Sequence, residues 1–289
     1  MIRSCPFLFH LCIMYKNKLG KLWKWLKIIT LIYLVIGTTL YFLQEKILFQ
    51  SVKLSADHVF DFSTPFKEIN LAITEEKNIN IIQFTVPDSV CKGVVLYFHG
   101  NRRNIERYAP YASNFTKNNY EVWMIDYPGY GKSTGERSED ILYNDALEFY
   151  KIARARFGKD SIIIYGRSLG TGIASHLASV RDCRQLILEA PYYSIDALFS
   201  HYAFIYPVSW MSKYHFPTYK NFEKIDAPIT IFHGTDDEII PFSQSEMLME
   251  PWNEIAPPRR QLIAIKKGKH NTLNDFPLYH QTLDSLLRR

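Results

Sequence analysis

Hydrophobic residues follow two distinct patterns along this chain, and each pattern predicts a different kind of strand. Residues 68–74 and 79–86 alternate apolar with polar positions, which is typical of an antiparallel hairpin with one solvated face. Further along, short apolar runs occupy consecutive positions, as strands buried on both faces of a parallel sheet do. These runs cover residues 94–98, 122–125, 162–165, 186–188, 229–232 and 262–265.

Helical patterns separate the apolar runs. The clearest covers residues 138–157, where apolar residues recur three and four positions apart, and Ser138 followed by Glu139 and Asp140 predicts a capped start. Strands and helices that alternate in this way predict an α/β fold with a mostly parallel central sheet and helices on both faces.

One interval, residues 190–228, is far more aromatic than an ordinary connection between strands. Residues 194–204 predict one amphipathic helix, and the rest is irregular. Two interpretations stay open: a hydrophobic helix packed on the sheet, or a small cap-like insertion that covers a site and supplies an apolar pocket.

A run of sixteen residues without a charge, 28–43, predicts a membrane span. A helix needs about 20 apolar residues to cross a bilayer. Lys24 and Lys27 can extend their ammonium groups to the interface, which makes up the difference. We therefore expect a tail over residues 1–23 and a transmembrane signal anchor over residues 24–43.

Two alternatives to an anchor are less consistent with this run. No small-x-small cleavage site of a signal peptide follows Leu43, and the run lacks the polar face of a core helix. Six basic residues precede the run and none comes directly after Lys46, so the N-terminus is expected in the cytoplasm. The domain over residues 44–289 would then lie on the non-cytoplasmic side.

The net charge of +5 comes from the N-terminal tail. Six of the 34 basic residues precede residue 28, so 28 basic residues remain against all 29 acidic ones. The domain therefore carries no basic excess, and its charge gives no support to nucleic-acid binding.

The strongest chemical motif is Gly166-Arg167-Ser168-Leu169-Gly170, which fits G-x-S-x-G. It follows the apolar run 162–165 and leads into a predicted helix over residues 171–179, the strand–turn–helix context of a nucleophile elbow. Small residues flank the serine in such a turn because the backbone approaches itself closely. The motif predicts Ser168 as a nucleophile, with its hydroxyl at the positive end of the following helix.

A serine nucleophile needs a base and an orienting acid. His270 follows the last predicted core strand in a loop, whereas His99 and His233 each precede a glycine at a strand end and are expected to brace those turns. Three consecutive acids, Asp236, Asp237 and Glu238, follow the strand at 229–232, and one of them is expected to orient the imidazole.

Two backbone N–H groups are expected to form an oxyanion hole. One belongs to Leu169, the residue after the nucleophile, and the other to Asn101 in the loop after the strand at 94–98.

Five motifs together resemble a membrane-anchored, serine-aminopeptidase-like branch of the α/β-hydrolase superfamily. They are HGN at 99–101, DYPGYGKSTG at 126–135, GRSLGTG at 166–172, HGTDDEIIP at 233–241 and GKHN at 268–271. The resemblance implies an α/β-hydrolase fold with Ser168 as nucleophile, His270 as base and Asp237 as acid, with Asp236 as the reserve. One departure is Arg102-Arg103, where the family usually has small residues.

The function predicted is that of a membrane-anchored serine hydrolase, which cleaves an ester, thioester or amide through an acyl-enzyme on Ser168 and needs no metal or organic cofactor. Its expected substrate is a small molecule or a lipid-like acyl compound. The alternatives are a non-catalytic binding module on the same fold, or a peptidase. A nucleotide site is not expected, because Asp126 stands where a P-loop ending in this G-K-S would need glycine.

Cys91 and Cys183 are expected to be free thiols. Each lies three residues before a core strand, and the family's strand order puts one strand between those two, so the cysteines should be about 10 Å apart. A disulfide needs Cα atoms within about 7 Å.

Overall fold

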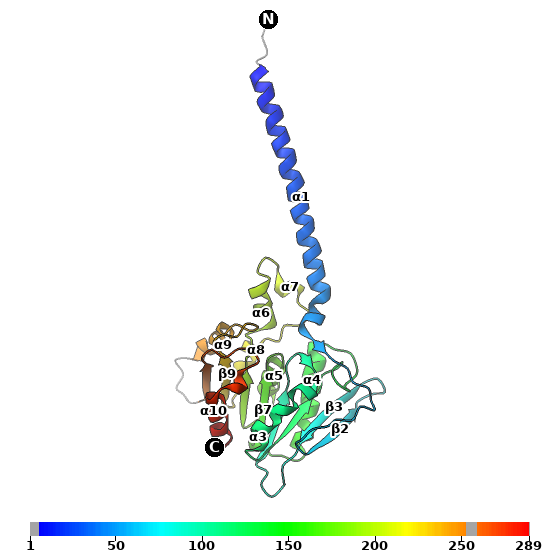
Figure 1. Cartoon of the computed structure of the whole chain (residues 1–289), viewed down its shortest axis with the longest axis vertical. Helices are drawn as coiled ribbons and strands as arrows, with labels where there is room; N and C mark the ends of the chain where they lie inside the picture. Colours follow the sequence, from blue (N-terminus) through cyan, green and yellow to red (C-terminus); the bar gives the residue numbers. More distant parts are fainter. Residues whose placement is uncertain (1–5, 253–258, 289) are drawn as a thin grey trace. The chain divides into compact units, whose positions relative to one another are not determined.

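The computed structural model describes residues 6–252 and 259–288, and the chain divides into two compact units, Met1–Ile47 and Leu48–Arg289. One helix, α1 (Pro6–Leu48), accounts for the described part of the first unit (Figure 1). Its segment Leu19–Leu48 is long and apolar enough to cross a bilayer, and little of it is buried, unlike a core helix. The helix extends past both ends of the predicted anchor because hydropathy marks only the apolar part of a helix.

The second unit is built on an eight-stranded sheet with the order β10-β9-β8-β7-β4-β6-β3-β2. The strands from β10 to β6 pair in parallel, and β3 and β2 join them antiparallel. All six predicted core runs fall inside strands, and the predicted hairpin is β2–β3, so the fold class is confirmed. The strands are β2 (Phe66–Ala72), β3 (Asn78–Phe84), β4 (Gly93–Phe98), β6 (Tyr120–Ile125), β7 (Ile162–Arg167), β8 (Gln185–Glu189), β9 (Ile229–Gly234) and β10 (Arg260–Ile265).

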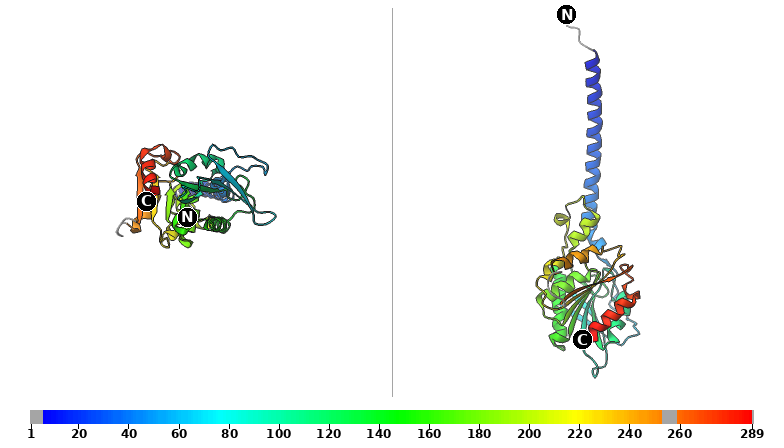
Figure 2. Two further views of the ribbon diagram at one scale, coloured as in Figure 1. Left: turned by 90° about the horizontal axis from the view of Figure 1, so that it is seen from below. Right: turned by 90° about the vertical axis from the view of Figure 1, so that its left-hand side faces the viewer.

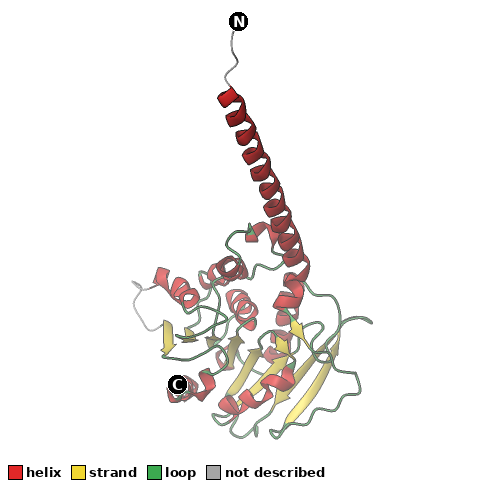
Figure 3. Cartoon of the chain, turned by 45° about the horizontal axis from the view of Figure 1, so that its top comes forward, coloured by secondary structure: helices red, strands yellow, loops and turns green. Residues whose placement is uncertain are grey.

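Helices cover both faces of this sheet (Figures 2 and 3). Alternate side chains of β4 enter two separate cores: Leu96 joins the core that contains α4 and α5 residues, whereas Tyr97 joins the one that contains α3 and α10 residues. Strands buried on both faces explain the consecutive apolar runs. The helices are α2 (Ile105–Tyr108), α3 (Ser113–Thr116), α4 (Glu139–Arg154), α5 (Gly170–Val180), α9 (Ser243–Met249) and α10 (Pro277–Arg288), with 3₁₀ turns at Ala109–Ala112, Lys159–Ser161, Glu250–Trp252 and Leu273–Asp275.

The predicted helix cap at Ser138 is present, since its side chain accepts a hydrogen bond from the Ile141 N–H at 3.2 Å. Free Cys91 and Cys183 are present too, and β7 lies between the strands that follow them, β4 and β8.

The aromatic insertion at residues 190–228 has a packed base and an exposed tip. It contains α6 (Ile195–Tyr202), α7 (Val208–Met211) and α8 (Thr218–Phe222), and the Ser194 side chain caps α6 through the Ala197 N–H. Phe216 is buried in the core on the α4–α5 side, whereas Phe204 and Trp210 are exposed. The buried base fits the interpretation of a segment packed on the sheet, and the interpretation of a cap over a site stays a prediction.

A two-stranded parallel sheet, β1 (Gln50–Ser51) with β5 (Arg102–Arg103), was not predicted. Two residues per strand are too few to show a periodicity. The Gln50 N–H donates to the Asn101 carbonyl at 2.9 Å, and the Val52 N–H donates to the Arg103 carbonyl at 2.9 Å. The segment that follows α1 is therefore bonded to the loop expected to supply an oxyanion donor.

Candidate active site

Ser168 occupies a sharp turn between β7 and α5, with a backbone φ of +50°. The flanking glycines are required by close packing. A Cβ on Gly170 would lie 2.1 Å from the Phe98 carbonyl oxygen, and one on Gly166 would lie 2.7 Å from the Ala174 Cβ. The left-handed conformation of a serine is strained and is typical of functional sites, where it aims the side chain.

His270 connects the serine to an acid. Its Nε2 lies 2.9 Å from Ser168 Oγ, and its Nδ1 lies 2.8 Å from Asp237 Oδ2. The three residues come from the loops after β7, β9 and β10, at the carboxyl ends of parallel strands, and all three are buried. The structure thus brings together the nucleophile, base and acid that the sequence predicts, across more than a hundred residues of chain.

Asp237 is held in its charged form. Its Oδ1 accepts hydrogen bonds from the Ile239 and Ile240 N–H groups at 2.9 and 2.8 Å. Burial alone would raise the pKa of Asp237, but hydrogen bonds from His233 and His270 and attraction to His270 hold that pKa well below its ordinary value. Asp236 is exposed and accepts only a local hydrogen bond from the Thr235 hydroxyl, so the geometry favours Asp237 over the reserve.

His233 braces the acid loop, as predicted, and also reaches the acid itself. Its Nε2 lies 2.8 Å from the Ile240 carbonyl oxygen and 3.3 Å from Asp237 Oδ2. Both partners are acceptors, so Nε2 carries the hydrogen, and Nδ1 faces the Ser245 hydroxyl at 2.6 Å. This second contact could not be predicted from the sequence, because Asp237 and His233 are four residues apart in an irregular turn.

The loop expected to complete an oxyanion hole lies beside the nucleophile. A Cβ on Gly100 would be 3.5 Å from the Ser168 Cβ. Among the described residues, the N–H groups of Asn101 and Leu169 donate no hydrogen bond, so both are available to an incoming oxygen. The Tyr130 hydroxyl donates to the Asn101 carbonyl at 2.8 Å, which fixes the peptide that follows the Asn101 N–H.

His99 supports this loop from below and is fully buried. Its Nδ1 lies 2.7 Å from the Gly100 carbonyl oxygen, its Nε2 lies 3.1 Å from Asp126 Oδ1, and its ring stacks on Tyr108. Burial raises the pKa of Asp126, and the hydrogen bond from His99 opposes that rise. His99 is thus a bracing residue, as expected.

A buried ion pair beneath the nucleophile was missed by sequence reasoning. Arg167 Nε lies 3.2 Å from Glu189 Oε1, both side chains are almost fully buried, and the Ser168 N–H donates to the Glu189 carbonyl at 2.9 Å. Tyr165 and Tyr279 donate to the same carboxylate. Glu189 directly follows the apolar run at 186–188, so only its position at the carboxyl end of the strand could have singled it out.

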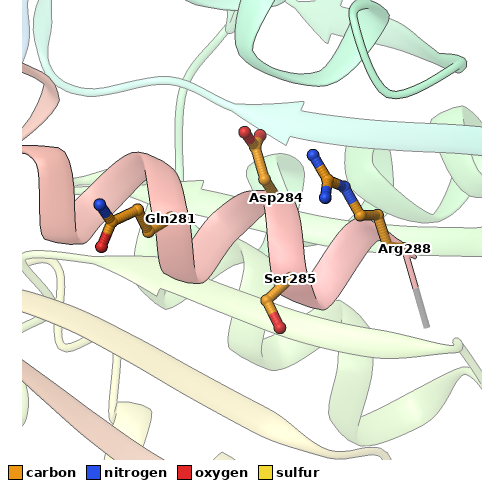
Figure 4. Close-up of a pocket in the computed structure, with 4 residues that line it drawn as sticks. All are labelled: Gln281, Asp284, Ser285 and Arg288. Carbon is orange, nitrogen blue, oxygen red and sulfur yellow. The ribbon is translucent and has the colours of Figure 1, made fainter.

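No cluster of metal-ligating side chains occurs in residues 6–252 and 259–288. A solvent-facing depression on the outside of α10 is lined by Gln281, Asp284, Ser285 and Arg288 (Figure 4). Asp284 there accepts a hydrogen bond from the Asn118 amide and pairs with Lys117. Burial raises the pKa of Asp284, but these two contacts lower it by more, so the pKa lies below the ordinary value. This depression belongs to the surface of α10 and contains no triad residue.

Comparison with known proteins agrees with this fold. Residues 89–221 match the family model described as serine aminopeptidase, S33. An esterase from Pyrococcus furiosus superposes with a TM-score of 0.65 at 18% identity, over 84% of this chain and 97% of that one. Alpha/beta hydrolase domain-containing protein 10 from mouse gives 0.56 at 18% identity, over 76% and 96%. These likenesses show that the chain has the α/β-hydrolase fold.

Among curated proteins, the chain is similar to two α/β-hydrolase domain-containing proteins of animals. It is 32% identical over 197 residues to protein 17C of Xenopus tropicalis, a match that covers 66% of this chain and 59% of the relative. It is 28% identical over 237 residues to aho-3 of Caenorhabditis elegans, covering 77% and 68%. The chain spans less than two thirds of the length of the protein 17C relative.

Proposed function

We propose that this protein is a membrane-anchored serine hydrolase that cleaves an ester, thioester or amide through an acyl-enzyme on Ser168. The observation that carries the proposal is the unbroken chain of contacts from Ser168 Oγ through the His270 ring to the Asp237 carboxylate, at 2.9 and 2.8 Å. The match to the family model described as serine aminopeptidase, S33, and the similarity to a structure described as an esterase support hydrolysis in general.

The proton route follows from these contacts. Because Asp237 Oδ2 is an acceptor, the neutral His270 ring carries its hydrogen on Nδ1 and leaves Nε2 free to take the Ser168 proton. The serine oxygen then attacks the substrate carbonyl, and His270 returns the proton to the leaving group. In the second half of the reaction, His270 Nε2 takes a proton from water, and the water oxygen attacks the acyl carbonyl. The bond to Ser168 Oγ then breaks, His270 returns the proton to Oγ, and the acid product leaves.

The negative oxygen of the tetrahedral intermediate would be held by the Leu169 and Asn101 N–H groups. Fixed donors of this kind stabilise the charge that develops during reaction, and the loss of one costs about 10²–10³-fold in rate. The contact of His99 Nδ1 with the Gly100 carbonyl holds the peptide that carries the Asn101 N–H, and the hydrogen bonds from Gln50 and Tyr130 to the Asn101 carbonyl hold the next peptide.

Anchoring and orientation are part of the proposal. We infer that α1 spans a bilayer, since it contains the candidate span Leu19–Leu48. Because the basic residues lie before the apolar run, we infer that the N-terminus is in the cytoplasm and the hydrolase domain on the other side. Carbonate extraction of membranes tests anchoring, and protease protection of a C-terminal epitope tests orientation. Release of the chain by carbonate, or digestion of the C-terminal epitope by a protease added on the cytoplasmic side, would overturn this part.

Labelling with a fluorophosphonate tests the chemistry. We expect the full chain in detergent to form one covalent adduct that is lost in Ser168→Ala. Ser179→Ala is a matched control, because Ser179 lies on the same helix and its hydroxyl donates only to the His176 carbonyl. No adduct on the native chain, or an adduct that survives Ser168→Ala, would favour a non-catalytic binding module instead.

A peptidase is the second candidate, favoured by the description of the matching family model. Esters of p-nitrophenol with rising acyl chain length and aminoacyl p-nitroanilides separate the two. We expect kcat/KM to rise with acyl length, because the aromatic insertion is rich in apolar side chains. A kcat/KM for an anilide above that of every ester would assign the peptidase.

A further inference from the structure

The tip of the aromatic insertion, residues 203–211, displays two large aromatic side chains to solvent. Phe204 is 82% exposed and Trp210 is 88% exposed, although each is of a type that folding normally buries. Aromatic residues are enriched where a protein meets the interface between a bilayer and water. Two such side chains within seven residues of one segment suggest an interaction site.

The insertion tip has an ordered, hydrogen-bonded backbone and follows a partly buried helix. The α6 helix beneath it is capped by Ser194 and buries Ile195 and Leu198. Backbone hydrogen bonds run through the tip itself, from the Ala203 N–H to the Phe199 carbonyl and from the Trp210 N–H to the Pro207 carbonyl. The two aromatic side chains are therefore held outward by a fixed backbone.

Charge in this segment suits a surface of phosphate headgroups. No acidic residue occurs between Asp196 and Glu223, while Lys213 and Lys220 lie within that interval. A lipid headgroup region attracts basic residues and repels acidic ones.

The chain leaves α1 close to the base of the same insertion. Phe49, the first residue after α1, packs edge-to-face against Tyr214 with ring centroids 4.8 Å apart. Phe49 follows the last residue of the apolar run, Leu43, by six positions, so the two are separated by at most about 22 Å even in a fully extended chain. An anchored domain therefore cannot carry this part of the insertion far from the bilayer.

The insertion also contacts the candidate active site. The Tyr202 hydroxyl, at the end of α6, donates to the Ile239 carbonyl at 2.8 Å, and the Ile239 N–H donates to Asp237 Oδ1 at 2.9 Å. The last residue of α6, directly before the tip, is thus bonded to the loop that contains Asp237. A bilayer that receives the tip comes next to the loops that surround Ser168.

We propose that the insertion tip docks on the lipid bilayer through Phe204 and Trp210, so that an acyl substrate passes from the membrane to Ser168 without crossing water. The proposal rests on the proposed function in one respect, the assignment of α1 as a membrane anchor. It adds a second membrane contact, a defined source of substrate and two residues that set access.

Spin labelling of the full chain in phosphatidylcholine vesicles tests the contact directly. A nitroxide is placed at Trp210→Cys after the four native cysteines are replaced by serine, with Val59→Cys as the matched control because Val59 is 83% exposed. We expect collisions with oxygen to exceed those with a water-soluble nickel complex at 210 and the reverse at 59. Equal access of the nickel complex to both sites would overturn docking.

Kinetics test the consequence. We expect the double variant Phe204→Ser with Trp210→Ser to hydrolyse p-nitrophenyl acetate within twofold of the native chain, and to hydrolyse a long-chain ester embedded in the vesicles at least tenfold more slowly. Val59→Ser should change neither rate. An equal loss on both substrates, or no loss on either, would refute the proposal.

The outcomes separate the two proposals. If the native chain hydrolyses neither ester, the proposed function fails, while the nitroxide at 210 still measures docking. If neighbouring labelled chains broaden the spectrum of the label at 210, and the spectrum sharpens on dilution with unlabelled chain, a second copy covers the tip and the bilayer does not.

Discussion

Replacing Asp237 by asparagine is the sharpest test of the triad, because the structure dictates how the new side chain must lie. The Ile239 and Ile240 N–H groups require an oxygen at the Oδ1 position, so the asparagine NH₂ must occupy the Oδ2 position. There it faces His270 Nδ1 as a donor and forces that nitrogen to become the acceptor.

The consequence falls on the other ring nitrogen. With Nδ1 unprotonated, Nε2 of the neutral ring carries the hydrogen and points it at Ser168 Oγ, so it cannot take the serine proton. The corresponding change in a serine protease lowers kcat by about 10⁴-fold, and each tenfold loss corresponds to about 1.4 kcal/mol of activation free energy. We expect a loss of about 10³–10⁴-fold here, or about 4–5.5 kcal/mol.

Asp236→Asn is the matched control, since the neighbouring carboxylate is exposed and bonds only to Thr235. We expect less than a twofold change in kcat for this variant. Initial rates with p-nitrophenyl acetate and the rate of fluorophosphonate labelling measure both. Asp237→Asn with a tenth or more of native activity, or Asp236→Asn with an equal loss, would show that the assignment of the acid is wrong.

Three further predictions follow from single contacts. Gly170→Ala should lower the unfolding free energy by about 3 kcal/mol, because its Cβ would lie 2.1 Å from the Phe98 carbonyl, whereas Gly158→Ala, with nothing within 4 Å, should leave it nearly unchanged in thermal unfolding. Burial raises the pKa of the Cys183 thiol to about 12, so alkylation at pH 8 should reach it only after unfolding, and rapid modification of Cys183 itself in the native chain, located by peptide mapping, would contradict this. The pKa of Asp237 is lower in the folded chain than in the unfolded one, so its stabilisation is complete above the ordinary value of 3.8 and is lost as the pH falls below it. The difference in Tm between the native chain and Asp237→Asn should therefore be constant near pH 7 and shrink below pH 3.8, and a difference that grows in acid would contradict the sign.

The fold could be predicted because its signals are local. Strands buried on both faces give consecutive apolar residues, and the Ser138 cap and the close contact of Gly166 with Ala174 join residues within a few positions of sequence. The order of nucleophile, acid and base along the chain completed the candidate triad, although the choice of Asp237 over Asp236 required the family resemblance.

The missed features depend on contacts between distant segments. The ion pair of Arg167 with Glu189 joins neighbouring strands, and the pairing of β1 with β5 joins residues about fifty positions apart through backbone groups alone. Backbone hydrogen bonds place no constraint on side-chain type, so the composition of residues 50–51 carries no trace of them.

That short pairing makes the point of proteolytic cleavage decisive for activity. Gln50 and Val52 donate to the carbonyls of Asn101 and Arg103, and Leu54 donates to that of Gly131. A protease that cuts before residue 50 would shed a domain that keeps these bonds and a formed oxyanion loop. One that cuts between residues 54 and 66 would shed a domain without them. For the membrane-anchored hydrolase proposed above, a shift of a few residues in the cut would therefore decide whether release from the membrane spreads the activity or ends it.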